Sequence, residues 1–239
     1  MKRADLLLAE KGHAASRSEA QAAIRAGLVK VNGEVLTKPS KSIADDAAIE
    51  YQKPHPFVSR GGIKLAAALD HFQFSPEGLA CLDIGASTGG FTDVLLAGGA
   101  VRVYALDVGH GQLHSRLRRD PRVIVRDGVN ARDLSITHVP DAIQAIVVDV
   151  SFIGLKLVLP PALELAAPGA WLVALVKPQF EVGRLWVGKG GIVRDPELHR
   201  AACERVVKTV TELGFETNIM ESPILGAEGN KEFLLHAHH

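Results

Sequence analysis

The sequence contains little cysteine, no excess of charge of either sign and no long uninterrupted apolar run. Two cysteines among 239 residues are too few for a disulfide framework, so Cys81 and Cys203 are expected to be reduced thiols of an intracellular protein. Because 27 basic residues balance 27 acidic ones, the overall charge favours no particular partner. Any surface for nucleic acid must therefore be local.

Signals for export or membrane insertion are also missing. The three leucines at 6–8 form too short an apolar run for a secretory signal. The most apolar long window, 157–176, is interrupted by three prolines and by Glu164, which indicates a helix, a turn and a strand instead of a membrane span. We expect a cytoplasmic protein with no membrane partner and no bound metal.

Two regions of the chain differ in character. Residues 1–53 form a small basic module, because eight basic side chains oppose four acidic ones within 1–44. Lys53–Pro56 opens a stiff linker over 54–60, since proline disfavours helix at the preceding residue. Residues 61–239 alternate strand and helix patterns and are expected to form the larger domain.

Local signals in the first region predict two helices followed by a hairpin. A helix over 4–11 ends at Gly12, and Ser16 with Glu19 has the spacing of a capping box that opens a second helix. Asn32–Gly33 lies between two β-prone runs, which is the strongest short hairpin signal. The module is therefore expected to be a small α+β domain.

The second region predicts a doubly wound α/β fold with a seven-stranded, Rossmann-like sheet. Helical patterns fill most gaps between apolar runs, and alternating strands and helices favour a mainly parallel sheet. The strand candidates are Leu79–Ile84, Val101–Leu106, Val123–Val125, Ala145–Val150, Trp171–Val176, Glu216–Met220 and Phe233–Leu235.

A glycine-rich turn follows the first of these strands. The run from Cys81 ends in Gly85, Gly89 and Gly90, after which a helix begins at Phe91. Such a turn lets the backbone approach a ligand, and the helix start favours polar groups. The turn alone does not distinguish nicotinamide, flavin and S-adenosylmethionine, but the absence of Gly-x-Gly-x-x-Gly spacing disfavours a dinucleotide.

Aspartates stand at the ends of four predicted strands, at positions 83, 107, 127 and 149. The carboxyl ends of parallel strands share the edge at which such sheets bind ligands, and Asp107 could accept hydrogen bonds from a ribose diol. Asp127 could instead be an ordinary helix cap. The residues predicted to contact the cofactor are Asp83, Gly85, Ser87, Gly89, Gly90, Phe91, Asp107, Val108, Asp127 and Asn130.

Two lysines and two carboxylates are expected at the same edge. Asp149 and Lys177 each end a strand, Glu232 starts the last one, and Lys64 lies on a helix before the first strand. A partly desolvated lysine near a second cation can lose its proton near neutral pH and deprotonate a hydroxyl. The alternative is a salt-bridge network that only ties strands together.

The first region resembles the S-four-type RNA-binding fold, named after a small-subunit ribosomal protein. The matching residues are Arg3, Asp5, Leu7, Arg17, Ala20, Ile24, Gly27, Val29, Val31–Gly33, Lys38–Ser40 and Asp46. The resemblance implies binding to structured RNA through phosphate contacts. The basic residues expected to make these contacts are Arg3, Arg17, Arg25, Lys30 and Lys38, with Arg60 in the linker.

Over its full length the sequence resembles the TlyA family, in which such a module is fused to an FtsJ-type ribose 2′-O-methyltransferase. The matching segments are VSRGGIKL (58–65), LDIGASTGGFTDVLL (82–96), ALDVGHGQL (105–113), DPRVIV (120–125), NAR (130–132), VVDVSFI (147–153), VKPQFEVG (176–183), GGIVRDP (190–196) and GNKEFLL (229–235). The resemblance implies S-adenosylmethionine as the cofactor and ribosomal RNA or a ribosomal subunit as the partner.

The family resemblance also implies roles for the four charged residues. Lys177 would be the general base, and Asp149 would orient it. Lys64 would position the ribose and favour loss of a proton from Lys177, and Glu232 would fix the lysines or the hydroxyl. Much of the catalysis would then be proximity and orientation.

Two other functions compete with this prediction. One is a non-catalytic RNA-binding or ribosome-assembly factor, and the other is a membrane-damaging haemolysin, as some family names suggest. The glycine-rich segment 182–193 fits a mobile lid that contacts RNA or an ordinary surface loop. Arginines between 116 and 132 could extend an RNA-facing patch or be solvated helix charges. The target nucleotide and the oligomeric state stay open.

Overall fold

The structure, a computed structural model, describes residues 1–14, 16–52, 54–226 and 229–238. It divides into two compact units, 1–56 and 57–239. Lys53, the last residue of the predicted first domain, lies outside the described residues. The proposed domain limits at 53 and 61 stay predictions.

The described residues of the first unit form two helices and five short strands. Ser16 caps the second helix, because its Oγ accepts a hydrogen bond from the Glu19 N–H at 3.1 Å. Asn32 and Gly33 both have positive φ, as the tight hairpin turn requires. The elements are β1 Lys2–Arg3, α1 Ala4–Glu10, α2 Arg17–Arg25, β2 Val29–Val31, β3 Glu34–Val35, β4 Ser42–Ile43 and β5 Ile49–Tyr51.

The second unit is built on a seven-stranded sheet in the order β11-β12-β10-β9-β6-β7-β8. β12 runs antiparallel to both neighbours, and the other pairs are parallel. This confirms the predicted seven-stranded fold. The strands are β6 Ala80–Ile84, β7 Arg102–Asp107, β8 Val123–Asp127, β9 Ile143–Val148, β10 Ala166–Val176, β11 Glu216–Glu221 and β12 Phe233–His238.

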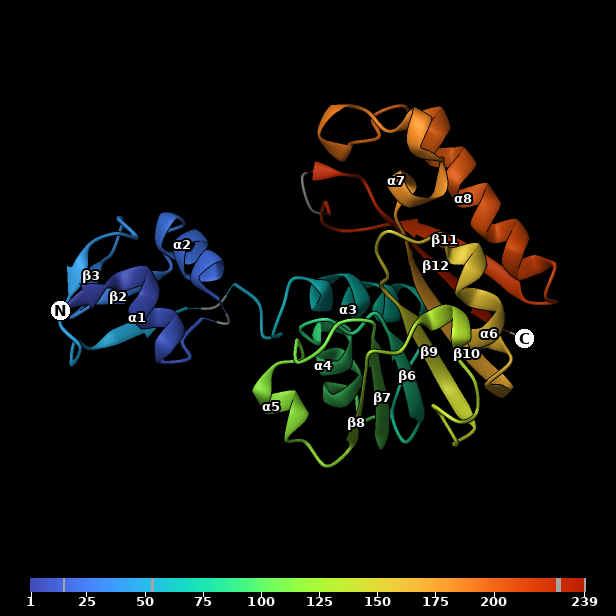
Figure 1. Ribbon diagram of the computed structural model, residues 1–239, viewed down its shortest axis with the longest axis horizontal. Helices are drawn as coiled ribbons and strands as arrows, with labels where there is room; N and C mark the ends of the chain where they lie inside the picture. The colour runs from blue at the N-terminus through green and yellow to red at the C-terminus, as the bar shows by residue number, and fades with distance from the viewer. Residues whose placement is uncertain (15, 53, 227–228, 239) are drawn as a thin grey trace. The chain divides into compact units, whose positions relative to one another are not determined.

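Helices cover both faces of this sheet (Figure 1). Alternate residues of a strand enter different cores: Ile146 and Val148 of β9 pack in the core with α6 and α8, whereas Ala145 and Val147 pack in the core with α3 and α4. The helices are α3 Gly61–Phe72, α4 Gly90–Ala97, α5 Ser115–Arg118, α6 Leu159–Leu163, α7 Pro178–Glu181 and α8 Pro196–Thr211. Short 3₁₀ turns are η1 Ala131–Asp133, η2 Leu155–Leu157, η3 Arg184–Trp186 and η4 Lys189–Gly191.

The strand register brings the predicted functional residues to one edge. Ile84 of β6 lies opposite Leu106 of β7 and Val148 of β9, at the carboxyl ends of all three strands. Because β12 is antiparallel, its first residue, Phe233, pairs with Val176 at the end of β10. Among the described residues, no helix has both the length and the apolar character that crossing a membrane demands.

Candidate active site

The glycine turn after β6 brings the backbone against the end of β9. Gly85 has φ +84°, and a Cβ there would lie 2.4 Å from the carbonyl oxygen of Asp149. Only glycine fits this close approach. The N–H of Ser87 donates to Asp107 Oδ2 at 2.8 Å, and the N–H of Gly109 donates to Asp107 Oδ1 at 2.7 Å. The turn and the end of β7 are thereby fixed to each other.

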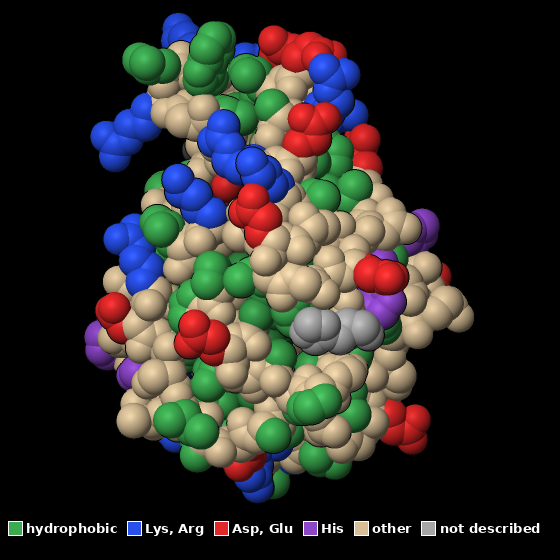
Figure 2. Space-filling model, turned by 90° about the vertical axis from the view of Figure 1, so that its right-hand side faces the viewer, with side chains coloured by type: hydrophobic (Ala, Val, Ile, Leu, Met, Phe, Trp, Pro, Cys, Tyr) green, Lys and Arg blue, Asp and Glu red, His purple; other side chains and the backbone are tan. Residues whose placement is uncertain are grey.

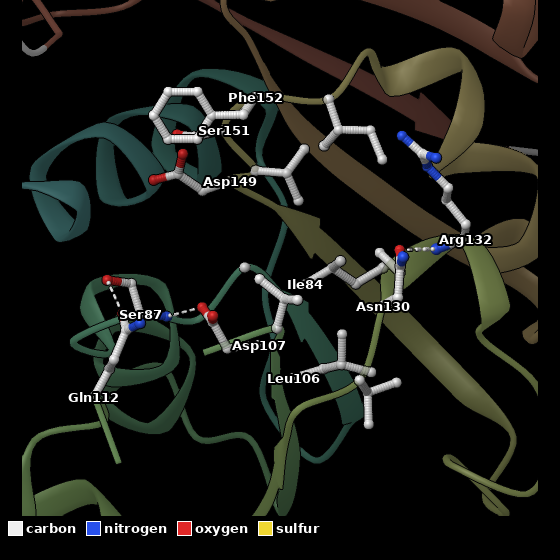
Figure 3. A pocket seen from close by; sticks show the side chains of 16 residues that line it. Ile84, Ser87, Leu106, Asp107, Gln112, Asn130, Arg132, Asp149, Ser151 and Phe152 are labelled. Carbon is white, nitrogen blue, oxygen red and sulfur yellow. Dashed lines mark hydrogen bonds between the residues drawn. The ribbon is translucent and has the colours of Figure 1, made fainter. Parts of the chain in front are cut away.

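A cavity of about 520 Å³ opens at this edge of the sheet, within the usual size range of small-molecule sites. Figure 3 shows Asp107 and Ser87 on one side, Asn130 and Arg132 on another, and Asp149 with Phe152 above them. Six of the residues singled out from the sequence line it, together with apolar residues of the strand ends. Those six are Gly85, Ser87, Asp107, Val108, Asn130 and Asp149.

Other predicted cofactor residues lie away from this cavity. Asp83 is fully buried beneath the turn and accepts a hydrogen bond from Thr92 Oγ1 at 2.6 Å. Burial raises the pKa of its carboxyl to about 7. Asp127 accepts from the Gly111 N–H and from Arg118, and these bonds hold its pKa below the usual value. Contacts of Asp83 and Asp127 with a cofactor stay predictions.

The remaining glycine-turn residues lie at the start of α4. A Cβ at Gly89 would collide with Leu117, so this glycine packs against the protein. Gly90 and Phe91 line a second cavity of about 210 Å³. The second cavity adjoins the first, because both are lined by Gly85, Ser87, Asp149 and Ser151.

The two predicted lysines line the second cavity, each paired with a predicted carboxylate. Lys177 Nζ lies 2.6 Å from Asp149 Oδ1 and donates to Ser151 Oγ at 2.9 Å. Lys64 Nζ lies 2.5 Å from Glu232 Oε2. Glu232 does not itself line the cavity, but its carboxylate accepts a hydrogen bond from Lys64, which does. The structure therefore brings all four charged residues together as two ion pairs.

Sequence inspection missed several side chains around the two cavities. Phe152 has φ +65° and is 91% exposed, with its ring 5.1 Å from that of Phe180. Positive φ is unusual for a bulky residue and clusters at functional positions. Its place three residues after a strand-end aspartate was the one available signal. Ser59 and Ser151 also line the second cavity.

In the first unit, two of the predicted RNA-contact arginines also hold the fold. Asp5 is fully buried and accepts hydrogen bonds from Arg3 and Arg17, each at 3.0 Å, and from Gln21 at 2.7 Å. The Arg3 bonds are the main reason that the pKa of Asp5 lies well below its usual value. The side chains of Arg3 and Arg17 are still 42% and 50% exposed.

The other predicted RNA-contact residues are not paired with a carboxylate of a described residue. Arg25, Lys30 and Lys38 are exposed, and none forms an ion pair with a described residue. Arg60, in the second unit, is exposed and donates to the carbonyl of Leu225 at 2.9 Å.

The arginines near α5 are mostly engaged within the second unit. Arg116 donates to both carboxylate oxygens of Asp93 at 2.9 and 2.8 Å. Arg118 pairs with Asp127, and Arg122 pairs with Asp120. This arrangement reduces the charge that the expected basic patch can offer to RNA.

The sheet order, the glycine turn and the cavity at the carboxyl edge define a methyltransferase domain. An O-methyltransferase from Bacillus cereus, solved in complex with SAH, shares the fold with a TM-score of 0.54 and 20% identity over 78% of this chain and 84% of that chain. The FtsJ-like methyltransferase model matches residues 57–239, and the S4 domain model matches residues 2–47.

Similar proteins extend over nearly the whole chain. The 16S/23S rRNA (cytidine-2′-O)-methyltransferase TlyA of Mycobacterium tuberculosis (strain H37Rv) is 43% identical over 98% of this chain and 88% of its own. Hemolysin A of Brachyspira hyodysenteriae is 44% identical over 98% of both. A solved structure of a hemolysin-named protein from Streptococcus thermophilus has a TM-score of 0.79 and 41% identity, covering 99% of this chain and 88% of that one. The chain belongs to the FtsJ-like methyltransferases, and among them to the TlyA family that carries an S4 domain.

Proposed function

We propose that this protein is an S-adenosylmethionine-dependent methyltransferase that modifies the 2′-hydroxyl of a ribose in ribosomal RNA. The observation that carries the proposal is the position of the Lys177–Asp149 ion pair between two adjoining cavities. The larger cavity suits a nucleoside-type cofactor, and the smaller, lysine-lined cavity suits a hydroxyl acceptor. The name of the TlyA relative specifies the same reaction.

The larger cavity fits S-adenosylmethionine in size and in chemistry. Gly85 leaves space where a Cβ would fill the approach to Asp149, and apolar residues such as Leu106 offer a surface for a base. Asp107 already accepts two backbone N–H groups, and its remaining lone pairs can accept bonds from a ribose diol. The bound cofactor would supply a methyl group on a positively charged sulfur.

The four charged side chains have distinct parts in the proposed reaction. Lys177, having lost its own proton, would accept the proton of the ribose hydroxyl as that oxygen takes the methyl group, which the bound cofactor would supply from its sulfur. Asp149 holds the Lys177 ammonium that results, at the 2.6 Å separation of the ion pair. Lys64, fixed by Glu232, stabilises negative charge that develops on the oxygen. Holding both partners in line contributes much of the rate.

The S4 domain supplies the RNA-binding part of the proposal. Arg25, Lys30 and Lys38 are exposed and unpaired among the described residues, and Arg3 and Arg17 keep about half of their side chains accessible. Such cations bind phosphates without reading sequence, so affinity should fall steeply with salt.

The direct test uses the full chain, labelled S-adenosylmethionine and unmodified small and large ribosomal subunits. The wild-type protein should methylate one ribose, found by mapping the label. Lys177→Ala should lower the rate by about 100-fold or more, since removing a general base costs about 10²–10⁴-fold. Lys208→Ala, at an exposed position of α8, is the matched control and should retain activity. Label on a base or on protein, or full activity of Lys177→Ala, would refute the proposal.

The haemolysin names of two similar proteins favour a second candidate, direct damage to membranes. The described helices offer no membrane span. Dye release from phospholipid vesicles by the pure protein without cofactor would support this function, and we expect none.

A further inference from the structure

Asn230 is a buried amide that joins two loops next to the active site. It is 2% exposed, and both ends of its side chain are bonded to the backbone of another segment. Its Oδ1 accepts from the Val193 N–H at 3.1 Å, and its Nδ2 donates to the Gly191 carbonyl at 3.0 Å. A buried amide is costly unless its groups are paired, so this arrangement is specific to the two segments.

Backbone hydrogen bonds attach both Asn230 and Glu232 to the segment that precedes them. The backbone carbonyl of Asn230 accepts from the Gly226 N–H at 2.8 Å, and the carbonyl of Glu232 accepts from the Ser222 N–H at 2.9 Å. A Cβ at Gly226 would lie 2.0 Å from Glu232 Oε1. The Glu232 carboxylate is therefore confined between the Gly226 backbone and Lys64 Nζ.

The segment that Asn230 holds, residues 183–193, follows β10 and the short helix α7 and projects apolar side chains into solvent. Leu185 is 97% exposed and Trp186 is 63% exposed. Figure 2 shows hydrophobic side chains beside basic ones at the top of the molecule, the height at which Figure 1 draws this segment. Val182 and Val193 anchor it in a small core of their own, packed on α8 through Ala202. The segment is thus joined to the loop before β12 by the Asn230 amide.

We infer that Asn230 is a positioning residue, which fixes the Glu232 carboxylate against Lys64 and ties that ion pair to the place of segment 183–193. The inference rests on the proposed function, in which Lys64 acts on the acceptor hydroxyl. A shift of about 1 Å in a catalytic group can cost on the order of 100-fold in rate. Loss of the Asn230 amide therefore slows methyl transfer through Glu232.

The first experiment measures single-turnover methyl transfer to unmodified ribosomal subunits by Asn230→Ala. We expect a 10-fold to 100-fold lower rate, with the Kd for S-adenosylmethionine within twofold of wild type, because Asn230 does not line the larger cavity. Asn218→Ala, an exposed asparagine in β11, is the control and should behave as wild type. An unchanged rate for Asn230→Ala overturns the inference.

A double-mutant cycle with Glu232→Gln separates positioning from general stability. If Asn230 acts through Glu232, Asn230→Ala should cost less than threefold in the Glu232→Gln background. An equal loss in both backgrounds overturns the inference. Should Asn230→Ala fail to fold, Gly226→Ala tests the position of the same Glu232 carboxylate with the Asn230 amide intact. A wild-type rate of methyl transfer by Gly226→Ala would also overturn the inference. Absence of ribose methylation by the wild-type protein would instead refute the proposed function.

Discussion

The buried Lys64–Glu232 pair offers a test that separates catalysis from structure. The two side chains are 10% and 3% exposed, and Lys64 Nζ lies 2.5 Å from the carboxylate. Glu232→Ala would leave the ammonium buried without its partner, and breaking such a pair costs about 3–5 kcal/mol. For a domain of this size, about 2–4 °C is lost per kcal/mol, so the melting temperature should fall by roughly 10 °C.

Replacing both partners gives the informative comparison. Lys64→Met with Glu232→Leu removes both charges together, and such exchanges of a buried ion pair are often neutral or stabilising. The double variant should melt near the wild-type temperature, measured by circular dichroism, and yet fail to transfer methyl groups to ribosomal subunits. A double variant that stays active would show that the pair only ties the strands together. A Glu232→Ala protein that melts like wild type would refute the energetic reasoning.

Two further predictions concern the first unit and the cavity rim. The pKa of Asp5 is lowered in the folded protein. Its bonds to Arg3 and Arg17 therefore stabilise the fold at pH values above the unfolded-state pKa of about 4. This stabilisation is lost as the pH falls through the folded-state pKa. Asp5→Asn should cost about 1–2 kcal/mol at pH 7, because water screens the half-exposed arginines, and calorimetry should show the difference shrink below pH 4; a constant difference would contradict this. Phe152 lines the larger cavity and is 91% exposed, so its ring can contact RNA or the cofactor. Phe152→Ala should raise the KM for ribosomal subunits about 10-fold, as loss of one stacked base costs about 1–3 kcal/mol. An unchanged KM with a weakened Kd for S-adenosylmethionine would show that the ring contacts the cofactor instead.

The fold was largely predictable because its signals are local. The Ser16–Glu19 spacing gave the start of α2, and Asn32–Gly33 gave the hairpin. The apolar runs gave all seven strands of the sheet. The start of β10 was missed: the strand begins at Ala166 and pairs there with Ile143, before a register shift over a proline and a glycine. Strand propensity disfavours both residues, so only the tertiary pairing reveals this extension.

The site was predictable at the level of strand ends but not of individual contacts. Sequence order places a charged residue at a sheet edge, and this was enough to bring Asp149 and Lys177 to the same cavity. It does not say which partner a side chain selects. Asp127 bonds Arg118 and does not line the larger cavity, and Asp5 binds Arg3 of β1 and Arg17 at the start of α2. Those choices depend on neighbours distant in sequence and on rotamers.

The direction of one strand decides whether Glu232 can belong to the site at all. β12 has six residues and rises about 3.3 Å per residue, so its two end residues are roughly 17 Å apart. A parallel seventh strand would place Glu232 at the far edge of the sheet, beyond reach of Lys64. Because β12 is antiparallel, Phe233 pairs with Val176, and the residues before Phe233 meet those after Val176. The antiparallel direction of β12 that brings Glu232 to Lys64 also brings Asn230 to the segment after Lys177. The hydrogen bonds between Asn230 and that segment therefore follow from the same topology that builds the active site.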